Sequence, residues 1–558
     1  MHKLPLSVSR TLLPLVVSLL SQPGFCAQLV PGAQIEAQVN VELRLVGPDA
    51  LEVSYALPAA CDKLAFTKNG RDGAAMRRSW QPLDGCAEAG ADRLARSGAS
   101  CPVLRFRVPA ATEQAGYPAA FPLGQGLYAH LSNYTVADSC GKPRYRLAAP
   151  WVAANGQIYR GTADAQGEDS SVMLLATAPG KTAFGTPGWF DRRLSPAALA
   201  QIRQVADGTV AYLRGALPHA DFKPPMLAAS LATGPGGPRI GGDAGDVLRL
   251  SLYNWPRAPG PEENAQLTLL VAHEFSHRFQ LRDAVDAYPD ARLIHEGGGE
   301  FLRWMTSLHE GWMTPDAAAA DLDRALATCM LYSDGQSWRA LNPRQIGVNR
   351  LEYACGLPAY VYGLAARQGP GTALGRVDGF YAALKRGARP DFAQAMDCGT
   401  GPSARCTAGW TARLLDGAGA MDDQWAALLR ASGLARLQPP TQVQRDAMVL
   451  RALVKLMQDD CGGRSGSMPV PDGVVLDGFK ACRTFTQDAH VTTVEGLRVA
   501  GDAGTGAAMT AACTARHQVV LGLKDGAALA VPCAEPYPMR SAFWHADIDK
   551  ILAALARE

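Results

Sequence analysis

Apolar and polar residues alternate strictly along the first part of the chain. Between residues 35 and 45 every second residue is apolar and the residues between them are polar, a period of two that predicts a half-buried β-strand. The same period recurs at residues 51–57, residues 103–108 indicate another strand, and proline and glycine separate such segments up to about residue 150. The pattern predicts a β-rich, sandwich-like domain over residues 28–150.

The pattern changes after residue 150. Strand candidates at residues 172–176, 226–231 and 247–253 and a helical stretch at residues 196–213 predict a mixed α+β unit. Helical patterns rich in alanine and leucine follow from about residue 296. We therefore expect a multidomain α+β protein in which residues 151–440 combine a mixed sheet with a helical half.

The carboxy-terminal residues 441–558 change in composition again. Cysteines, two alternating stretches, an Asp525-Gly526 hairpin turn and a final helix are found there. These features predict a small accessory α+β domain that contains disulfides.

The first 27 residues read as a secretory signal. Lys3 and Arg10 precede an apolar stretch at residues 12–20 that is too short to span a bilayer. We expect a periplasmic or secreted protein, with no integral membrane segment once the signal is removed. Cys26 offers an alternative, anchoring through a lipid on that cysteine, but the residues before it match this signal poorly.

The number of cysteines and the net charge indicate the compartment of the protein and the kind of partner it binds. Of the thirteen cysteines, twelve follow residue 27, and an even number is typical of an oxidising compartment. We expect pairing within regions, including Cys398 with Cys406 and Cys461 with Cys482. The net charge of +2, without a run of basic residues, gives no sign of a nucleic-acid partner.

A metal-binding pattern lies at residues 270–280, which read LVAHEFSHRFQ. His273 and His277 are four residues apart, so a helix presents both imidazoles on one face, and Glu296 follows after eighteen intervening residues. A lone buried histidine is more often a structural core residue. The pair favours a metal, because the buried Glu274 between the two histidines also needs a partner. We expect one Zn²⁺ per chain.

Together with Glu296-Gly297, the motif resembles that of the gluzincin metallopeptidases, in particular the aminopeptidase N and glycyl aminopeptidase families. The resemblance implies a thermolysin-like catalytic domain behind a β-rich domain, and zinc-dependent hydrolysis of peptide bonds in a peptide or protein substrate. It assigns His273, His277 and Glu296 as zinc ligands. Glu274 becomes the general base for attack by zinc-bound water.

The resemblance also implies a tyrosine that hydrogen-bonds the oxyanion of the transition state. Tyr353 lies at the matching distance in the segment Tyr353-Ala-Cys-Gly, although Cys355 replaces the lysine of those families. Tyr360 and Tyr362 compete for this role.

Two further features follow the ligand Glu296. Glu300 lies four residues later, so on a regular helix it shares the same face and is expected to orient a ligand imidazole, although a solvated glutamate would look identical in sequence. Glycines at residues 297–299 inside a helix predict close approach of substrate or of a neighbouring helix; a loop is the alternative.

One upstream segment departs from the family pattern. Aminopeptidase N relatives carry a Gly-x-Met-Glu-Asn segment whose glutamate binds the free amine of the substrate, and here Ala244 stands in its place. Gly241, Gly242 and Asp243 remain candidate substrate-binding residues, with Asp243 or Asp246 as a possible ammonium partner. The sequence therefore leaves exopeptidase and endopeptidase open. It also leaves open an inactive zinc-binding interaction module and a zinc hydrolase of a non-peptide substrate.

Overall fold

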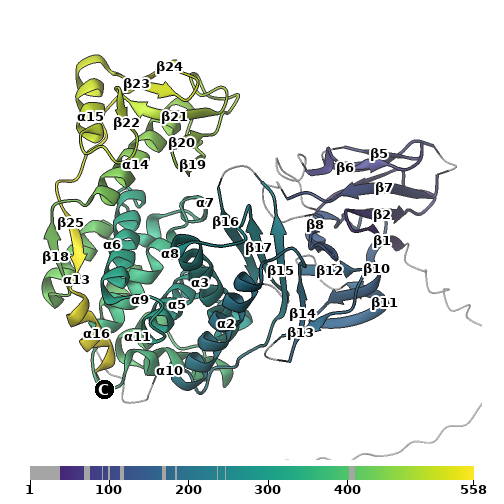
Figure 1. Cartoon of the computed structure of the whole chain (residues 1–558), viewed down its shortest axis with the longest axis horizontal. Helices are drawn as coiled ribbons and strands as arrows, with labels where there is room; N and C mark the ends of the chain where they lie inside the picture. The colour runs from purple at the N-terminus through teal and green to yellow at the C-terminus, as the bar shows by residue number, and fades with distance from the viewer. Residues whose placement is uncertain are drawn as a thin grey trace, which may run out of the picture.

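Nine strands of the described chain form an amino-terminal sheet (Figure 1). The computed structural model describes residues 38–67, 76–90, 92–98, 101–112, 119–165, 171–182, 185–234, 237–244, 247–400 and 409–557. The strand order is β4-β7-β2-β1-β10-β12-β9-β8, with β11 paired to β10. The strands are β1 (Gln38–Gly47), β2 (Ala50–Ala56), β4 (Gln81–Pro82), β7 (Val103–Pro109), β8 (Phe121–Pro122), β9 (Gly126–His130), β10 (Lys142–Ala154), β11 (Gln157–Ala165) and β12 (Ser171–Leu175).

The alternation at the start of the chain is confirmed as strand β1. Val39, Val41 and Leu43 are buried, while the residues between them are exposed or half-buried. A smaller sheet of β3 (Lys63–Ala65), β6 (Arg93–Arg96) and β5 (Ala87–Ala89) contributes side chains to the same core. The predicted signal peptide, with Cys26, lies outside the described residues, as does Cys406 of the predicted bridge to Cys398.

The predicted boundary at residue 150 lies inside strand β10. The chain continues through β11 into β12, and both strands pair with β10. The apolar run at residues 172–176, which we had expected in the mixed unit, therefore belongs to the amino-terminal sheet. All five residues of β12 are buried, and a short run buried on both faces carries no alternation that would show which sheet it joins.

A second sheet of the described chain runs in the order β13-β14-β15-β17-β16. The predicted strands at residues 226–231 and 247–253 are confirmed as β15 (Met226–Ala232) and β17 (Val247–Tyr253), which pair in parallel. Strand β16 (Arg239–Ala244) is antiparallel and forms the edge of this sheet. The remaining strands are β13 (Gly180–Lys181) and β14 (Pro187–Phe190).

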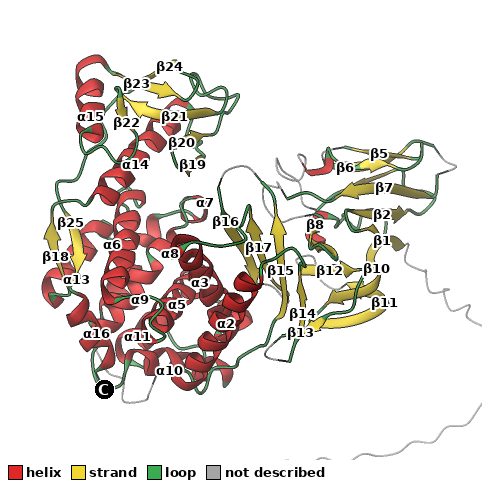
Figure 2. Cartoon of the chain, viewed as in Figure 1, coloured by secondary structure: helices red, strands yellow, loops and turns green. Residues whose placement is uncertain are grey.

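Helices build the rest of the middle part of the molecule (Figure 2). The predicted helix at residues 196–213 is confirmed as α2 (Pro196–Ala216), which starts at the Ser195 cap and packs on α3 (Pro261–Ser276). The helices and the second sheet share one large apolar core. The other helices are α4 (Arg282–Val285), α5 (Gly298–His309), α6 (Pro315–Tyr332), α7 (Pro343–Val348), α8 (Leu351–Ala354), α9 (Gly356–Ala365), α10 (Ala373–Lys385), α11 (Phe392–Cys398), α12 (Trp410–Asp416) and α13 (Met421–Ser432).

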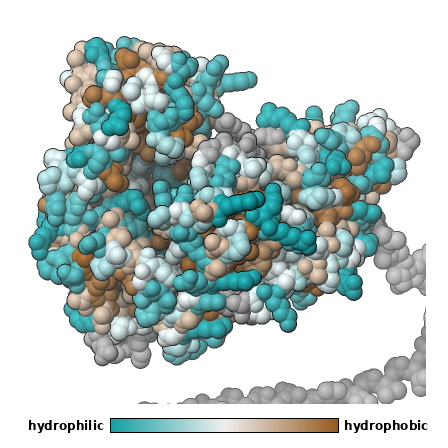
Figure 3. Space-filling view, in the orientation of Figure 1, coloured by the Kyte–Doolittle hydropathy of each residue, from teal (hydrophilic) through white to brown (hydrophobic). Residues whose placement is uncertain are grey.

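A small α+β unit follows, and it stands off the helical part with a hollow beneath it (Figure 3). The predicted Asp525-Gly526 turn joins β23 to β24, and Gly526 has a left-handed φ of 85°. The elements are α14 (Gln442–Asp460), β19 (Ser467–Val470), β20 (Gly473–Leu476), β21 (Ala489–Val494), β22 (Leu497–Arg498), α15 (Thr505–Arg516), β23 (Gln518–Leu523) and β24 (Ala528–Pro532).

The end of the chain leaves this unit again. Strand β25 (Phe543–Ala546) pairs with β18 (Ala435–Gln438), and α16 (Ile548–Ala556) buries Ile551 and Leu555 in the core of the helical part. The final helix was predicted within the accessory domain, but its apolar face covers α9 instead. No helix of the described residues is long and apolar enough to cross a membrane.

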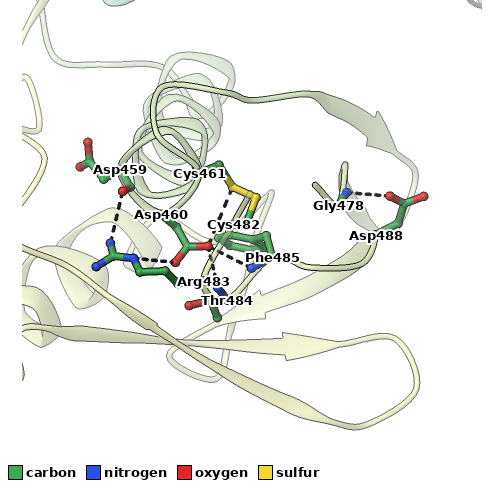
Figure 4. The surroundings of a disulfide bond; sticks show 9 residues. All are labelled: Asp459, Asp460, Cys461, Gly478, Cys482, Arg483, Thr484, Phe485 and Asp488. Atoms are coloured by element: carbon green, nitrogen blue, oxygen red, sulfur yellow. Dashed lines mark hydrogen bonds and ion pairs between the residues drawn. A yellow bond between two sulfur atoms is a disulfide. The ribbon is translucent and has the colours of Figure 1, made fainter. Parts of the chain in front are cut away.

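The described disulfides all join cysteines of the same region, as predicted. The bridge between Cys461 and Cys482 is confirmed and ties the end of α14 to the loop before β21 (Figure 4). Beside it, the buried Asp460 accepts hydrogen bonds from two backbone amides, those of Thr484 and Phe485. Since both cysteines are oxidised, this cluster has no thiolate to offer a metal. The other described bridges are Cys61–Cys140, Cys86–Cys101, Cys329–Cys355 and Cys513–Cys533.

Candidate metal centre and cleft

Helix α3 carries the two histidines of the motif at its carboxy-terminal end. It begins with Pro261, and the Glu263 side chain accepts a hydrogen bond of 2.8 Å from the Gly260 amide, as expected for a helix start. His273 and His277 are 6 % and 8 % exposed. Their Nε2 atoms lie 2.9 Å apart, so both lone-pair positions converge on one point.

Glu296 brings a carboxylate to the same point from a second segment. Its Oε2 lies 3.5 Å from Nε2 of His273 and 3.3 Å from Nε2 of His277. The residue sits in a π-helical turn, Leu293–Gly297, a wide turn that often occurs at functional sites. This Oε2 is buried and has no hydrogen-bond partner among the described residues. Two imidazole nitrogens and one unsatisfied carboxylate oxygen are a donor set that fits Zn²⁺.

The other ring nitrogens of the two histidines also lie close to polar side chains. Nδ1 of His273 lies 2.9 Å from Oε1 of Glu300, and Nδ1 of His277 lies 2.8 Å from Oε1 of Gln280. The buried Arg303 binds Glu300 through Nε at 3.1 Å. Such contacts fix the tautomer and orientation of a ligand imidazole. The structure therefore places Glu300 where the helix period predicted it.

Buried charges decide the protonation of this cluster. Burial disfavours the charged form of His273, but the neighbouring carboxylates of Glu296 and Glu300 outweigh it and raise the pKa of His273 to about 10. Burial would raise the pKa of the carboxyl groups of Glu296 and Glu300. The imidazoles of His273 and His277 nevertheless hold the pKa of Glu296 well below its ordinary value. Arg303 and His273 do the same for the pKa of Glu300. Without a metal, these carboxylates thus favour the protonated form of the His273 imidazole. A divalent cation would replace this proton.

Glu274 lies between the donor set and the edge strand β16. It is 8 % exposed and lines a cleft of about 420 Å³ together with His273 and Tyr353. Gly242 of β16 packs directly on it, since a Cβ built at Gly242 would lie 2.5 Å from Oε1 of Glu274. Gly241 precedes Gly242 on the same strand. Asp243 lies opposite Arg249 of strand β17, and its side chain lies outside the described structure.

Tyr353 is the predicted tyrosine that reaches the centre. Its ring lies 5.7 Å from the ring of His273. Burial, followed by the charge of Glu296, raises its pKa well above the ordinary value, so the phenol keeps its proton. The two competitors lie elsewhere: Tyr360 donates to the Ile294 carbonyl at 3.0 Å, and Tyr362 packs in the core against Trp425.

The departure at Cys355 has a structural explanation. Cys355 forms a disulfide with Cys329 of helix α6. The bridge lies two residues after Tyr353 and anchors that segment to a long helix. A disulfide thus stands at the position where the resemblance implied a lysine.

The three consecutive glycines are helical, and each meets a different neighbour. A Cβ at Gly297 would lie 2.6 Å from Cα of Gly356, where α9 crosses. At Gly298 it would meet Gln280 at 2.6 Å, and at Gly299 the His277 ring at 2.7 Å. The predicted close approach of a neighbouring helix is confirmed, and the loop alternative is wrong.

Sequence reasoning missed three residues around the centre. His295 stacks on His277 with ring centroids 4.2 Å apart, and burial followed by the charge of His277 lowers its pKa to about 2, so it is neutral. Gln280 and Arg303 were also missed. Only Gln280 had a local signal, because it lies three residues after a ligand histidine within the same motif segment.

Comparison with known proteins shows a likeness of fold. The chain is similar to an aminopeptidase N family protein from Idiomarina loihiensis, with 12 % identity, 93 % of this chain and 100 % of that chain covered, and a TM-score of 0.50. Leukotriene A4 hydrolase from Saccharomyces cerevisiae is more distant, with 10 % identity, coverage of 63 % and 62 %, and a TM-score of 0.34. No family model and no curated protein sequence matches. The resemblance indicated by the motif is thus confirmed at the level of fold: the chain has a mixed α+β multidomain architecture similar to that of an aminopeptidase N family protein.

Proposed function

We propose that this protein is an exported zinc-dependent metallopeptidase. The observation that carries the proposal is the convergence of Nε2 of His273, Nε2 of His277 and Oε2 of Glu296, with Glu274 beside them at the floor of a cleft. Three protein ligands that leave a fourth position open are the arrangement of catalytic rather than structural zinc. Bound there, zinc would act as a Lewis acid that polarises the substrate carbonyl and acidifies water.

Glu274 is proposed as the general base. Its carboxylate is fixed by burial and by the close contact with Gly242. It would take a proton from the attacking water and deliver it to the leaving amine, a transfer that contributes about 10²–10⁴-fold.

Tyr353 is proposed as the donor to the oxyanion. Its raised pKa keeps the phenol protonated at neutral pH, which a hydrogen-bond donor to developing negative charge requires. Glu300 and Gln280 would hold the imidazoles of His273 and His277 in place during the reaction.

Strand β16 is proposed to receive the peptide. It is the last strand in the sheet order, so one side of it has no neighbouring strand in the described structure. An extended peptide can pair with such an edge through main-chain hydrogen bonds. Gly241 and Gly242 present no side chain there, which lets a second backbone come close.

The disulfides are the observation that supports the proposed export of the protein. Five are described, and such bridges form and persist in oxidising compartments, which supports a periplasmic or secreted location.

The test compares the mature zinc-loaded protein with the Glu274→Gln variant on a mixed peptide library analysed by mass spectrometry. We expect cleavage that depends on Glu274, with equal zinc content in both proteins by elemental analysis. The position of the cuts separates exopeptidase from endopeptidase. Zinc binding without any Glu274-dependent cleavage would refute the peptidase and point to a non-peptide hydrolase or a binding module.

A further inference from the structure

The cleft beside the metal ligands is rich in arginine. Its described lining contains more guanidinium groups than carboxylates. The arginines are Arg239, Arg303, Arg324 and Arg350, and the carboxylates are those of Glu274, Glu300 and Asp321. Zinc at the three donors would add further positive charge. The cleft therefore favours an anionic over a cationic substrate group.

Two of these three carboxylates, those of Glu300 and Asp321, are already engaged by arginine. Arg303 is bound by both Glu300 and Asp321, the latter at 2.8 Å. Asp321 also forms an ion pair with Arg324. A substrate ammonium that bound Glu300 or Asp321 would have to compete with the buried guanidinium of Arg303, which is costly.

Arg350 is in the opposite situation. It is exposed and forms no ion pair within the described part of the chain, and its described partner is the side chain of Tyr353. Its guanidinium lies over the ring of Tyr353, 4.5 Å from the centroid. The Tyr353 ring in turn lies 5.7 Å from that of His273, which places Arg350 within about three extended residues of the metal ligands.

The backbone at Arg350 is held in an uncommon conformation. Its φ of 51° and ψ of 40° are left-handed, a region that bulky residues rarely adopt and that clusters at functional sites. The residue directly precedes α8, which carries Tyr353 and ends at the disulfide-bonded Cys355. The guanidinium is thus presented from an anchored segment.

We propose that Arg350 binds a carboxylate of the substrate, an acidic side chain or the carboxy-terminal group, within three residues of the scissile bond. The inference rests on the proposed peptidase function and names its substrate class. Arginine suits the task because its planar fork binds both oxygens of a carboxylate. Arg239, on the edge strand β16 and stacked over Tyr253 at 4.4 Å, adds positive charge to the same cleft.

The test uses pairs of blocked peptides that differ by Glu or Gln at one position, and by a free or an amidated carboxy terminus. The variants are Arg350→Gln, Arg350→Lys and Arg350→Glu. Arg344→Gln is the matched control, because Arg344 is exposed on the neighbouring helix α7 and makes no ion pair among the described residues. The readout is kcat/KM for each pair.

We expect the unmodified protein to prefer the carboxylate peptide about tenfold, as for other hydrogen bonds to a charged group. Arg350→Gln should abolish this preference, Arg350→Lys should retain part of it, and Arg350→Glu should reverse it in favour of the uncharged peptide of each pair. Arg344→Gln should change nothing. Absence of a preference in the unmodified protein, or its persistence in Arg350→Gln, would overturn the inference. An equal loss for both peptides of a pair would also overturn it, because that result means Arg350 only positions Tyr353.

Binding separates this inference from the proposed function. The same peptide pairs are titrated into the zinc-loaded Glu274→Gln protein, with and without the Arg350 change, and followed by fluorescence anisotropy. If no peptide is cut but the carboxylate preference in binding depends on Arg350, the peptidase proposal fails and the carboxylate site stands. If binding shows no such preference, the carboxylate site fails whatever is cut.

Discussion

Gly242→Ala is expected to disable the proposed general base while leaving the fold and the metal centre intact. The new Cβ would lie 2.5 Å from Oε1 and 2.9 Å from Cδ of Glu274, whereas non-bonded carbon atoms prefer about 3.5–4.0 Å. The strand backbone is paired with β17, so the carboxylate must move by about 0.6–1 Å. A misplacement of about 1 Å can cost about 10²-fold in rate, or roughly 2.7 kcal/mol of transition-state stabilisation.

Gly241→Ala is the matched control on the same strand. A Cβ there would meet Tyr253 at an ordinary contact distance of 3.8 Å. Neither glycine has a positive φ, so alanine brings no backbone strain at either position. Both variants should keep the melting temperature and zinc content of the parent. Only Gly242→Ala should lose about a hundredfold in kcat. If Gly242→Ala keeps its kcat within threefold, or if Gly241→Ala loses as much, the contact with Glu274 does not fix the base and the reasoning is refuted.

Three further changes probe other parts of the centre. Tyr353→Phe removes the proposed oxyanion donor and should lower kcat about 10²–10³-fold at unchanged zinc content, and an equal kcat would exclude the role. Glu300→Ala removes the acceptor of His273 Nδ1 and should weaken zinc binding about 10–100-fold in competition with a chelator, whereas Glu300→Gln keeps an acceptor oxygen and should stay within threefold. Replacing Cys329 and Cys355 by alanine releases the Tyr353 segment and should lower kcat. The loss should exceed that caused by removing the Cys461–Cys482 bridge, which lies in another unit. Equal kcat values for the two variants would contradict this.

The local part of the metal centre could be predicted because helix geometry is fixed. Two histidines four residues apart on a helix must share a face, so His273 and His277 needed no tertiary information. The strict alternation that became strand β1 was equally local. Glu300 needed only continuity of the helix after Glu296, although the π-helical turn there was not foreseen.

The rest depended on contacts between distant segments. Strand β12 carries a continuous apolar run, which indicates burial but does not predict the strand with which it pairs. Helix α16 is amphipathic, and nothing in that pattern tells which core its apolar face covers. The pairing of Arg303 with Asp321 joins two helices through charged residues that look like surface residues in sequence. Their burial follows only from the packing of α5 on α6.

Ala244 and Cys355 depart from the pattern that the resemblance implies, whereas the metal motif is complete. Ala244 stands where the resemblance would place an amine-binding glutamate, and Glu300 and Asp321 of the cleft lining are committed to Arg303 and Arg324. Glu300 and Asp321 are therefore not free to hold a substrate amine, whereas Arg350 lies over Tyr353, where it can meet the opposite charge. The substrate charge that a cleft selects can change without moving the metal ligands, so hydrolysis and specificity should respond to separate substitutions. Glu274→Gln should abolish turnover for every peptide. Arg350→Gln should change only which peptides are preferred.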